Sequence, residues 1–359
     1  MKILLLLSLI GMALAIHRID PRVFQNLQSK GTTDVIVSFR NSNLTKVRVS
    51  FIAKYKSADR PTRLNAFYRS LKDHADKTQA GLLSSLSKAT SWKSIQVHQL
   101  WATNQIIVKN ATKEIIGLLE KSDDVSKVVN DRMIPLHVLQ AVPRSTRQEQ
   151  CTPDSNGLQW GIARTEAIKV WNEGTRGQGV VVSNTDTGVR YTHEALRNNF
   201  RSEHGWFDPY DGTSLSSDPL GHGTHTMGTL VGRTNGIGMA PDSQWIACKG
   251  CNEDGFCSTG ALLQCGQWTL CPTDPDGKNE NCTMAPLISA NSWGFESDRF
   301  FDDVLAAYVS VDILPVFSIG NGGPQCHETA YPGKSFASWL PHVTKLFSVR
   351  LSSVLFGDR

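Results

Sequence analysis

The chain has 359 residues, of which 40% are hydrophobic and 19% are charged, a composition typical of a globular protein with about two to three domains. The net charge of +4 conceals an asymmetry: residues 16–147 hold 22 Lys and Arg against 10 Asp and Glu, whereas residues 148–359 hold 14 against 23. No basic run is interleaved with aromatic residues, which argues against a nucleic-acid binder. The opposite charges instead favour association of the two halves.

The N-terminus has the features of a secretory signal peptide. Lys2 precedes the apolar run Ile3–Ile10, and Ala13-Leu-Ala15 is a small-x-small cleavage site. The run is shorter than the roughly 20 residues that span a bilayer, and no later stretch reaches that length. We therefore expect a signal peptide at residues 1–15, no membrane span, and a secreted, extracellular, soluble protein that begins at Ile16.

Secretion determines how the cysteines and the glycosylation sequons are interpreted. The eight cysteines all lie in the second half of the chain, at Cys151, Cys248, Cys251, Cys257, Cys265, Cys271, Cys282 and Cys326. Disulfides are the first expectation, with a connectivity that the sequence leaves open. A zinc knuckle at Cys248-x-x-Cys251, with Cys257 nearby, is the alternative, although its spacings fit no common zinc template. Sequons make Asn43, Asn110 and Asn281 candidate glycosylation sites.

Residues 16–147 are predicted to form a small α+β domain. The expected elements are a strand at 34–39, a helix from Pro61, strands at 94–100 and 105–109, a helix capped by Thr112, and a strand at 125–129. The long helix has an apolar face at Leu64, Phe67, Leu71, Ala75, Leu82 and Leu86. The order β-α-β-β-α-β is typical of a ferredoxin-like arrangement.

A basic and polar segment separates this domain from the rest of the chain. Pro143–Arg147 and the following residues 148–150 have no apolar pattern. Arg144 and Arg147 form an Arg-x-x-Arg pattern, which indicates either a processing site or an ordinary interdomain linker. We therefore expect domains at residues 16–147 and 148–359.

From residue 151 onward, strands and helices alternate. Strands are expected at 179–183, 244–249, 285–290 and 313–318, and helices at 258–270 and 299–310. Repeated βα units predict an α/β fold with a mostly parallel sheet flanked by helices. Chemistry gathers at the carboxyl ends of such strands, and Asp186, Ser292–Gly294 and Asn321 all follow strands.

Four short motifs carry a family resemblance, and they are Asp186-Thr-Gly188, Gly221-His-Gly-Thr-His225, Asn291-Ser-Trp-Gly294 and Ser318-Ile-Gly-Asn321. In order and spacing they resemble the signatures of the subtilisin-like serine proteases (peptidase S8), and most closely the bacillopeptidase F type. Residues 34–130 resemble the I9-type inhibitory propeptide of that family. The resemblance implies a secreted endopeptidase zymogen that cleaves proteins and peptides and needs no cofactor for chemistry. Its own propeptide would assist folding and block the cleft, and structural calcium occurs in many family members.

The resemblance assigns a role to each motif. Asp186 would accept a hydrogen bond from His222, the general base, although Asp-Thr-Gly alone is usually a turn. Asn321 would donate to the oxyanion, although Asn-Gly-Gly is also good turn chemistry. Backbone groups of the substrate-binding residues Ser292, Trp293 and Gly294 would pair with an extended peptide.

The second histidine of the central motif has two further interpretations. His225 follows His222 by three residues, which is a spacing that two metal ligands on one helix face can have. No Glu lies between them as in the His-Glu-x-x-His pattern of zinc peptidases, and this argues against a metal site. The resemblance makes the second histidine structural, so we expect His225 to lie in the core.

The nucleophile is missing from the printed sequence. The family serine lies in Gly-Thr-Ser-x-Ala-x-Pro beyond the oxyanion Asn, but the 38 residues after Asn321 hold no such motif. Gly212-Thr-Ser214 precedes His222 and lacks the Ala and the Pro, and the sequence after Tyr331-Pro-Gly333 departs from the family pattern. We therefore expect an incomplete peptidase domain without catalysis of its own. The alternative functions are an inactive pseudoprotease and a propeptide-type protease inhibitor.

Overall fold

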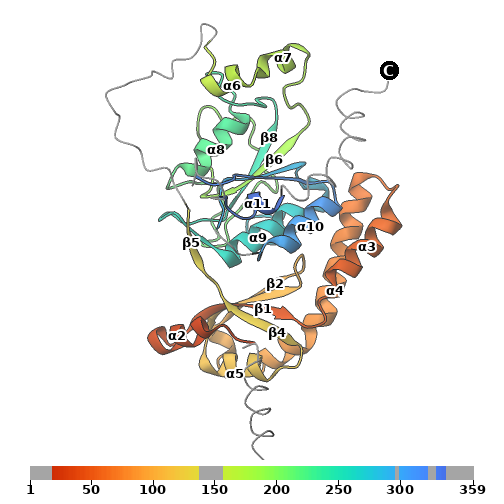
Figure 1. Ribbon diagram of the computed structural model, residues 1–359, viewed down its shortest axis with the longest axis vertical. Coiled ribbons are helices and arrows are strands. Elements are labelled where there is room, and N and C mark those ends of the chain that lie inside the picture. Colours follow the sequence, from red (N-terminus) through yellow and green to blue (C-terminus); the bar gives the residue numbers. More distant parts are fainter. Residues whose placement is uncertain (1–17, 137–156, 296–298, 322–328, 337–359) are drawn as a thin grey trace, which may run out of the picture. The chain divides into compact units, whose positions relative to one another are not determined.

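A computed structural model describes residues 18–136, 157–295, 299–321 and 329–336 (Figure 1). These residues fall into two compact units. The first unit combines residues up to Phe51 with Arg69–Arg132, and the second combines Ile52–Tyr68 with the residues from Met133 onward. Residues 52–68, which hold the end of one helix, a loop and the start of the next helix, therefore group with the α/β part of the chain and not with the rest of the N-terminal half.

Several predictions from the sequence fall outside the described residues. They are the signal peptide at 1–15, the processing residues Arg144 and Arg147, the domain boundary after residue 147, and the two cysteines Cys151 and Cys326. These predictions stay open. Within the described ranges, no helix is long and apolar enough to cross a membrane.

The first unit is built on an antiparallel sheet of four strands in the order β2-β3-β1-β4. The strands are β1 (Thr33–Phe39), β2 (Gln96–Leu100), β3 (Gln105–Ala111) and β4 (Val125–Asn130). Helix α5 (Lys113–Lys121) begins where predicted, because the Thr112 hydroxyl accepts a hydrogen bond from Ile115 N–H. The ferredoxin-like order of this unit is confirmed.

The helices of the N-terminal half match the prediction only in part. Helix α4 (Arg60–Leu86) begins one residue before Pro61, and all six residues of its predicted apolar face are buried. Two further helices were not predicted, α2 (Pro21–Lys30) and α3 (Leu44–Tyr55). The start of α2 has recognisable signals, since the Asp20 carboxylate caps Arg22 N–H at 3.0 Å and proline occupies the first turn.

The second unit has a parallel sheet of five strands in the order β11-β10-β6-β8-β7. The strands are β6 (Val181–Asp186), β7 (Trp206–Phe207), β8 (Gln244–Lys249), β10 (Ile288–Asn291) and β11 (Leu314–Phe317). Helix α8 (His222–Val231) packs against β6, whereas α9 (Thr259–Leu270) packs against β6 and β8 and also against α10 (Asp302–Ser310) (Figure 1). The predicted α/β class with a parallel sheet is confirmed.

Strand β8 shows why helices must cover both faces of this sheet. Alternate side chains of a strand point to opposite faces, and those of β8 belong to two different buried clusters. One cluster joins Trp245 and Ala247 to Met227 and Val231 of α8. The other joins Ile246 and Cys248 to Cys265 and Trp268 of α9.

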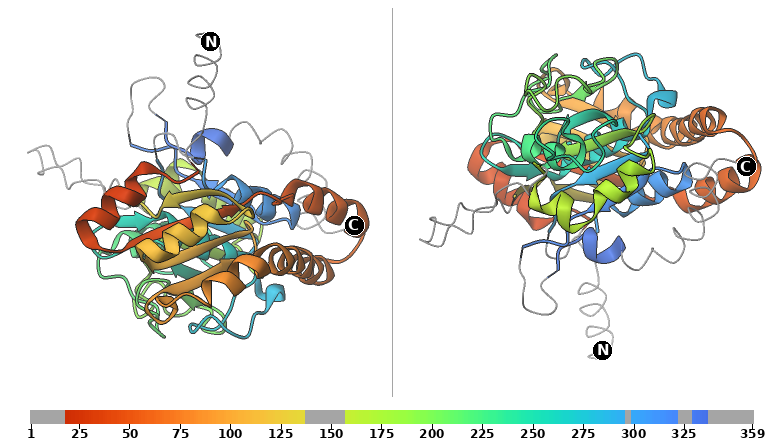
Figure 2. Two further views of the ribbon diagram at one scale, coloured as in Figure 1. Left: turned by 90° about the horizontal axis from the view of Figure 1, so that it is seen from below. Right: turned by 90° about the horizontal axis from the view of Figure 1, so that it is seen from above.

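Smaller elements complete the second unit. Strand β5 (Met133–Pro135) pairs antiparallel with β9 (Phe256–Ser258), which leads directly into α9. Helices α6 (Trp160–Arg164) and α7 (Ala167–Asn172), lime green in the right view of Figure 2, share a small apolar cluster. Helix α11 (Gly333–Phe336) follows Tyr331, whose backbone pairs with Phe295.

Six of the eight cysteines form disulfides within the described residues, and they pair as Cys248–Cys265, Cys251–Cys257 and Cys271–Cys282. The expected disulfides are confirmed, and the zinc knuckle is excluded because Cys248, Cys251 and Cys257 are all bonded in disulfides. Cys248–Cys265 joins β8 to α9 inside the core, where both residues are fully buried.

The N-cap of α9 offers a test of the fold. Ser258 Oγ accepts a hydrogen bond from Ala261 N–H at 3.0 Å. Replacing Ser258 with Ala is expected to lower the free energy of unfolding by about 1 kcal/mol, since the N–H loses its acceptor. Ser258→Thr keeps the hydroxyl and serves as the control in urea denaturation. Equal stability of the Ala variant and the wild type would contradict this assignment.

Candidate active site

The candidate residues meet at one edge of the parallel sheet. Strands β11, β10 and β6 are neighbours, and they end at Phe317, Asn291 and Asp186. Because parallel strands place their carboxyl ends together, the residues that follow them lie at the same edge. Helix α8 adds His222 as its first residue. The structure therefore brings together motifs that lie more than a hundred residues apart in the chain.

Asp186 and His222 form a hydrogen-bonded pair. His222 Nδ1 lies 2.7 Å from Asp186 Oδ1, and Asp186 is fully buried. The same carboxylate accepts Thr187 N–H at 2.7 Å and the Thr226 hydroxyl at 3.3 Å. An ionised carboxylate only accepts hydrogen bonds, so Nδ1 of the imidazole carries the proton and Nε2 is left as the basic nitrogen.

The surroundings of His222 favour its protonated form. The hydrogen bond to Asp186 is the largest cause that raises the pKa of the imidazole, burial works against it, and the charges of Asp186 and Asp218 raise it further. The side chain of His222 is 19% exposed and lines a cavity. The ring can thus take up a proton at the cavity while Asp186 stabilises the resulting positive charge.

Asp218 organises the helix start that carries His222. Its carboxylate accepts the backbone N–H groups of Gly221 at 2.8 Å and of Thr224 at 2.7 Å. It also accepts the hydroxyls of Thr224 at 2.6 Å and of Thr187 at 2.8 Å. The first N–H groups of α8 thereby gain an anionic acceptor, which also suits the positive end of the helix. The sequence analysis assigned no role to Asp218, although an Asp just before a helix start is a recognisable capping signal.

Two glycines allow the strand and the helix to approach each other. Gly188 has a φ of 102°, and a Cβ there would lie 1.9 Å from the Ser217 carbonyl oxygen. A Cβ on Gly223 would lie 2.0 Å from the Gly188 carbonyl oxygen. Both obstacles are backbone atoms, so a side chain at either position would push His222 away from Asp186.

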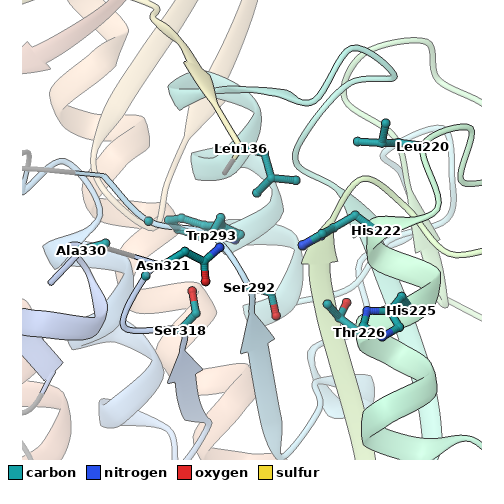
Figure 3. Close-up of a pocket in the computed structure, with 12 residues that line it drawn as sticks. Leu136, Leu220, His222, His225, Thr226, Ser292, Trp293, Ser318, Asn321 and Ala330 are labelled. Atoms are coloured by element: carbon teal, nitrogen blue, oxygen red, sulfur yellow. The ribbon is translucent and has the colours of Figure 1, made fainter. Parts of the chain in front are cut away.

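A cavity of about 440 Å³ lies beside the pair. His222 lines it from α8, while Ser292, Gly294 and Asn321 line it from the segments after β10 and β11. Figure 3 shows the side chains of His222 and Asn321 on opposite sides of the cavity and directed toward one another. The predicted catalytic residues and the predicted substrate wall thus share one site.

Trp293 anchors the wall that carries Ser292 and Gly294. It also lines the cavity, although only 2% of its surface is exposed. Its ring meets the rings of Phe301 at 5.2 Å and Phe317 at 5.1 Å, both edge to face. Such aromatic contacts stabilise a fixed orientation, so the backbone on either side of Trp293 is held in place beside the cavity.

The prediction for His225 is wrong. The side chain of His225 is exposed and lines the cavity, whereas it was expected in the core. The buried positions of α8 are Gly223, Met227, Gly228 and Val231, and His225 lies on another side of the helix. His222 and His225 are three residues apart on one helix, so they lie on the same side of α8, and this side lines the cavity.

A segment of the N-terminal half also reaches the cavity. Leu136, which follows β5, is one of its lining residues (Figure 3). Its N–H donates to the Gly255 carbonyl oxygen at 2.7 Å and so continues the pairing of β5 with β9. Chain that precedes the expected domain boundary therefore lies beside the candidate catalytic pair.

Metal binding finds no support in the side-chain positions. Across the residues that the structure describes, no group of three or more His, Cys, Asp or Glu side chains is placed to hold a metal ion. His222 is hydrogen-bonded to a carboxylate, and this arrangement suits a base.

The pH dependence of His222 is directly measurable by NMR of the 359-residue chain, with His222→Gln to assign the signal. We expect a pKa above the ordinary value of about 6.5, lowered in Asp218→Asn and lowered further in Asp186→Asn. Because the folded pKa is raised, the stability that this group contributes is full below the unfolded pKa and is lost as pH rises through the folded pKa. A pKa at or below the ordinary value would contradict the described geometry.

The candidate site lies in a part of the chain that is similar to known proteins. The model of the subtilase family, peptidase S8, matches residues 177–340. Bacillopeptidase F of Bacillus subtilis is 30% identical over 362 residues, which cover 92% of this chain and 25% of that protein. Subtilisin-like protease 9 of Arthroderma otae is 27% identical over 217 residues, which cover 59% of this chain and 49% of that protein.

Among solved structures, fervidolysin from Fervidobacterium pennivorans, a keratinolytic enzyme related to subtilisin, aligns with 84% of this chain and 41% of its own. The TM-score is 0.47 and the identity is 15%. The chain spans a quarter to a half of the length of the two curated relatives above. The family match covers Asp186, His222 and Asn321, and the similarity to bacillopeptidase F extends over nearly the whole chain. The chain therefore contains a subtilase (peptidase S8) domain, which the family model matches over residues 177–340.

Proposed function

We propose that the chain is the zymogen part of a secreted, subtilisin-like serine endopeptidase whose substrates are proteins and peptides. One observation carries the proposal. Asp186 and His222 form a 2.7 Å pair on one side of a cavity whose opposite side carries Asn321. A base, its orienting carboxylate and an amide donor around one cavity are what acyl transfer from a peptide requires.

In the proposed mechanism, His222, Asn321 and Asp186 each have a distinct role. His222 Nε2 takes the proton of a serine hydroxyl, whose oxygen then attacks the peptide carbonyl carbon. Asn321 donates a hydrogen bond to the oxyanion that forms. His222 next gives its proton to the leaving amine, and water hydrolyses the acyl-enzyme. Asp186 holds the imidazole and stabilises its charge in both proton transfers.

The nucleophilic serine is the part of the mechanism that we place outside residues 1–359. Ser292 and Ser318 line the cavity. Neither hydroxyl is hydrogen-bonded to His222 within the described part of the chain. The family motif Gly-Thr-Ser-x-Ala-x-Pro is absent from the sequence. We expect this motif in the complete gene product. Sequencing of the transcript downstream of the codon for Tyr331 would reveal it.

The zymogen state is supported by the segment that precedes the linker. Strand β5 pairs antiparallel with β9, and Leu136 lies at the cavity with His222. Addition of an extended strand to a sheet edge is a common way in which peptides are bound. We infer that residues 133–136 occupy the place of a substrate strand and inhibit the site until the chain is processed, with Arg144 and Arg147 as the candidate processing residues.

Secretion is supported by separate observations. The sequence begins with the features of a signal peptide, and three disulfides stabilise the second unit. Of the sequon residues, Asn43 and Asn110 are exposed and Asn281 is partly buried. The first two are therefore the more accessible sites for a glycan.

The test compares residues 1–359 with the complete gene product after reaction with a fluorophosphonate probe, which labels activated serines. We expect labelling of the complete product and none of residues 1–359. His222→Ala in the complete product should abolish the labelling. A complete product that stays unlabelled after processing would contradict the proposed peptidase, and labelling of residues 1–359 would contradict the missing nucleophile.

A second candidate function is inhibition of related proteases by the 359-residue chain itself, either as a pseudoprotease or as a propeptide-type inhibitor. The position of β5 and Leu136 beside the candidate catalytic pair favours it. Addition of the purified chain to an active subtilisin distinguishes this function. Unchanged hydrolysis at micromolar concentrations of the chain would rule it out.

A further inference from the structure

In the first two turns of α4, one face of the helix packs against the rest of the second unit. This face carries Arg60, Arg63, Leu64, Phe67 and Tyr68, which are buried or half-buried, whereas Pro61, Thr62 and Arg69 are exposed. The spacing of three and four residues is that of a single helix face. The face contains two arginines, so its contacts with the second unit are not simply apolar.

Each arginine binds backbone groups that precede a strand of the parallel sheet. The Arg60 guanidinium donates to the carbonyl oxygens of Ala285 at 3.2 Å and Pro286 at 2.8 Å, just before β10. Arg63 donates to the Ser310 carbonyl oxygen at 3.1 Å, at the end of α10. Arg63 also forms an ion pair with Asp312, which lies between α10 and β11.

Because the side chains of Arg63 and Asp312 are largely buried, the stability of their ion pair depends on the presence of both partners. The side chains of Arg63 and Asp312 are only 10% and 15% exposed. A guanidinium in such surroundings is stable only while its donors and its charge are matched. The acceptor at Ser310 is the carbonyl end of a helix, which attracts positive charge. Loss of either partner would therefore leave a buried charge uncompensated.

The position of the contact separates it from the cleft. Ala285, Pro286 and Asp312 precede β10 and β11, whereas Ser292 and Asn321 follow the same two strands. Each of these strands has four residues, so its first and last Cα atoms lie about 10 Å apart at roughly 3.3 Å per residue. The arginines consequently bind at the edge of the sheet opposite the candidate active site, outside the cavity that would hold a substrate.

We propose that residues 285–286 and 310–312 form an anchoring site for Arg60 and Arg63 of the N-terminal part of the chain. We call this site the arginine anchor. It holds the N-terminal part after the chain is cut between residues 136 and 157, and it does so independently of Leu136 in the cleft. Cutting the linker is then not sufficient for release. This consequence rests on the proposed zymogen function, whereas the anchor itself rests on the contacts alone.

The test uses the full chain with a specific protease recognition sequence placed at residues 145–150. After cutting, the rate at which the two fragments separate is followed by size-exclusion chromatography under native conditions. Arg63→Met keeps the aliphatic stem and removes the charge, and Asp312→Asn keeps a residue that tolerates the φ of 59° at this position. Each is expected to speed separation by about tenfold or more, since each leaves a buried charge unpaired.

Lys72→Met is the matched control. Lys72 lies on the same helix and pairs with Asp76, but the side chains of this pair are 32% and 47% exposed. Its loss should leave the separation rate nearly unchanged. Arg63→Lys should give an intermediate rate because it keeps the charge without the planar fork. Near-UV circular dichroism of the uncut variants verifies that each one is folded.

Three results would overturn the anchor. The first is a separation rate of folded Arg63→Met equal to that of the wild type. The second is a double variant, Arg63→Met with Asp312→Asn, whose effect equals the full sum of the single effects, because partners in one contact must be non-additive. The effect of Arg63→Met should also persist beside Leu136→Ala, and its disappearance there would place the anchor in the cleft. Failure of fluorophosphonate labelling would change none of these rates, so the two proposals fail separately.

Discussion

Replacing Asp186 with Asn in the complete gene product is expected to lower kcat by about 10⁴-fold, the loss seen when a serine protease loses its triad carboxylate. The substitution is nearly isosteric. Asp186 is fully buried and accepts hydrogen bonds from His222, from Thr187 N–H and from the Thr226 hydroxyl, and the Asn oxygen can keep only part of this set. The imidazole then loses the partner that fixes its proton on Nδ1.

Two consequences of the substitution can be measured apart from each other. The rate of hydrolysis of a peptide amide should fall, while circular dichroism and the unfolding midpoint show that the fold persists. The pKa of His222 should fall as well, because the hydrogen bond to Asp186 is the largest cause of its rise. A lower rate without a change in the pKa would indicate that Asp186 acts through the fold rather than through His222.

The control for this prediction is another acidic residue of the same unit. Asp242 pairs with Arg176 at 2.8 Å and with Arg233 at 3.6 Å, and it does not line the cavity. Asp242→Asn should leave kcat within a factor of about two, since partly exposed ion pairs contribute little. If both variants lose activity equally, the role assigned to Asp186 is contradicted.

The sequence was most informative where hydrophobic periodicity and turn chemistry agreed. Strand β8 was predicted at its observed bounds of Gln244–Lys249, and Ser258 was identified as the cap of α9. Both have strong local signals, an apolar run that alternates between two cores in one case and a capping hydroxyl in the other. Asp186 and Asn321 were identified as candidates because each follows a strand in a recognisable motif, whereas His222 was identified from its motif Gly221-His-Gly-Thr-His225 alone.

Features that depend on tertiary contacts were predicted less well. Helix α3 buries only Leu44 and Phe51, so its periodicity is too weak to show in the sequence. Strand β5 has three residues, and its register with β9 is set by the surrounding fold, because so short a strand has no pattern of its own. The disulfide partners of Cys248 and Cys251 depend on which chain segments lie close together, and spacing alone does not reveal that.

The error at His225 has a local cause. Helix α8 buries small residues, Gly223 and Gly228, together with Met227 and Val231, so its buried face carries no continuous apolar stripe. A family resemblance suggested a structural histidine, but the sequence offered no periodicity against which to check it. Asp218 was missed for a related reason, since its role depends on three elements that the fold brings together: the loop itself, the end of β6 and the start of α8.

Replacing Asn321 with Ala is expected to lower kcat of the complete gene product by about 10²–10³-fold and to leave KM nearly unchanged. The reason lies in its position opposite His222 across the cavity (Figure 3). An amide there can donate to the oxygen of a carbonyl whose carbon is attacked from the side of His222. This hydrogen bond strengthens only as negative charge develops, so its loss affects the transition state more than the bound substrate.

The measurement is steady-state hydrolysis of a peptide amide by Asn321→Ala, with Asn172→Ala as the control. Asn172 is exposed at the end of α7 and does not line the cavity, so its loss should have no effect on kcat. The pH profile separates the roles further. Asn321 does not titrate, so its variant should keep the pKa that governs kcat/KM, whereas Asp186→Asn should shift that pKa. A rise in KM with kcat preserved would assign Asn321 to substrate binding and would remove it from the oxyanion site.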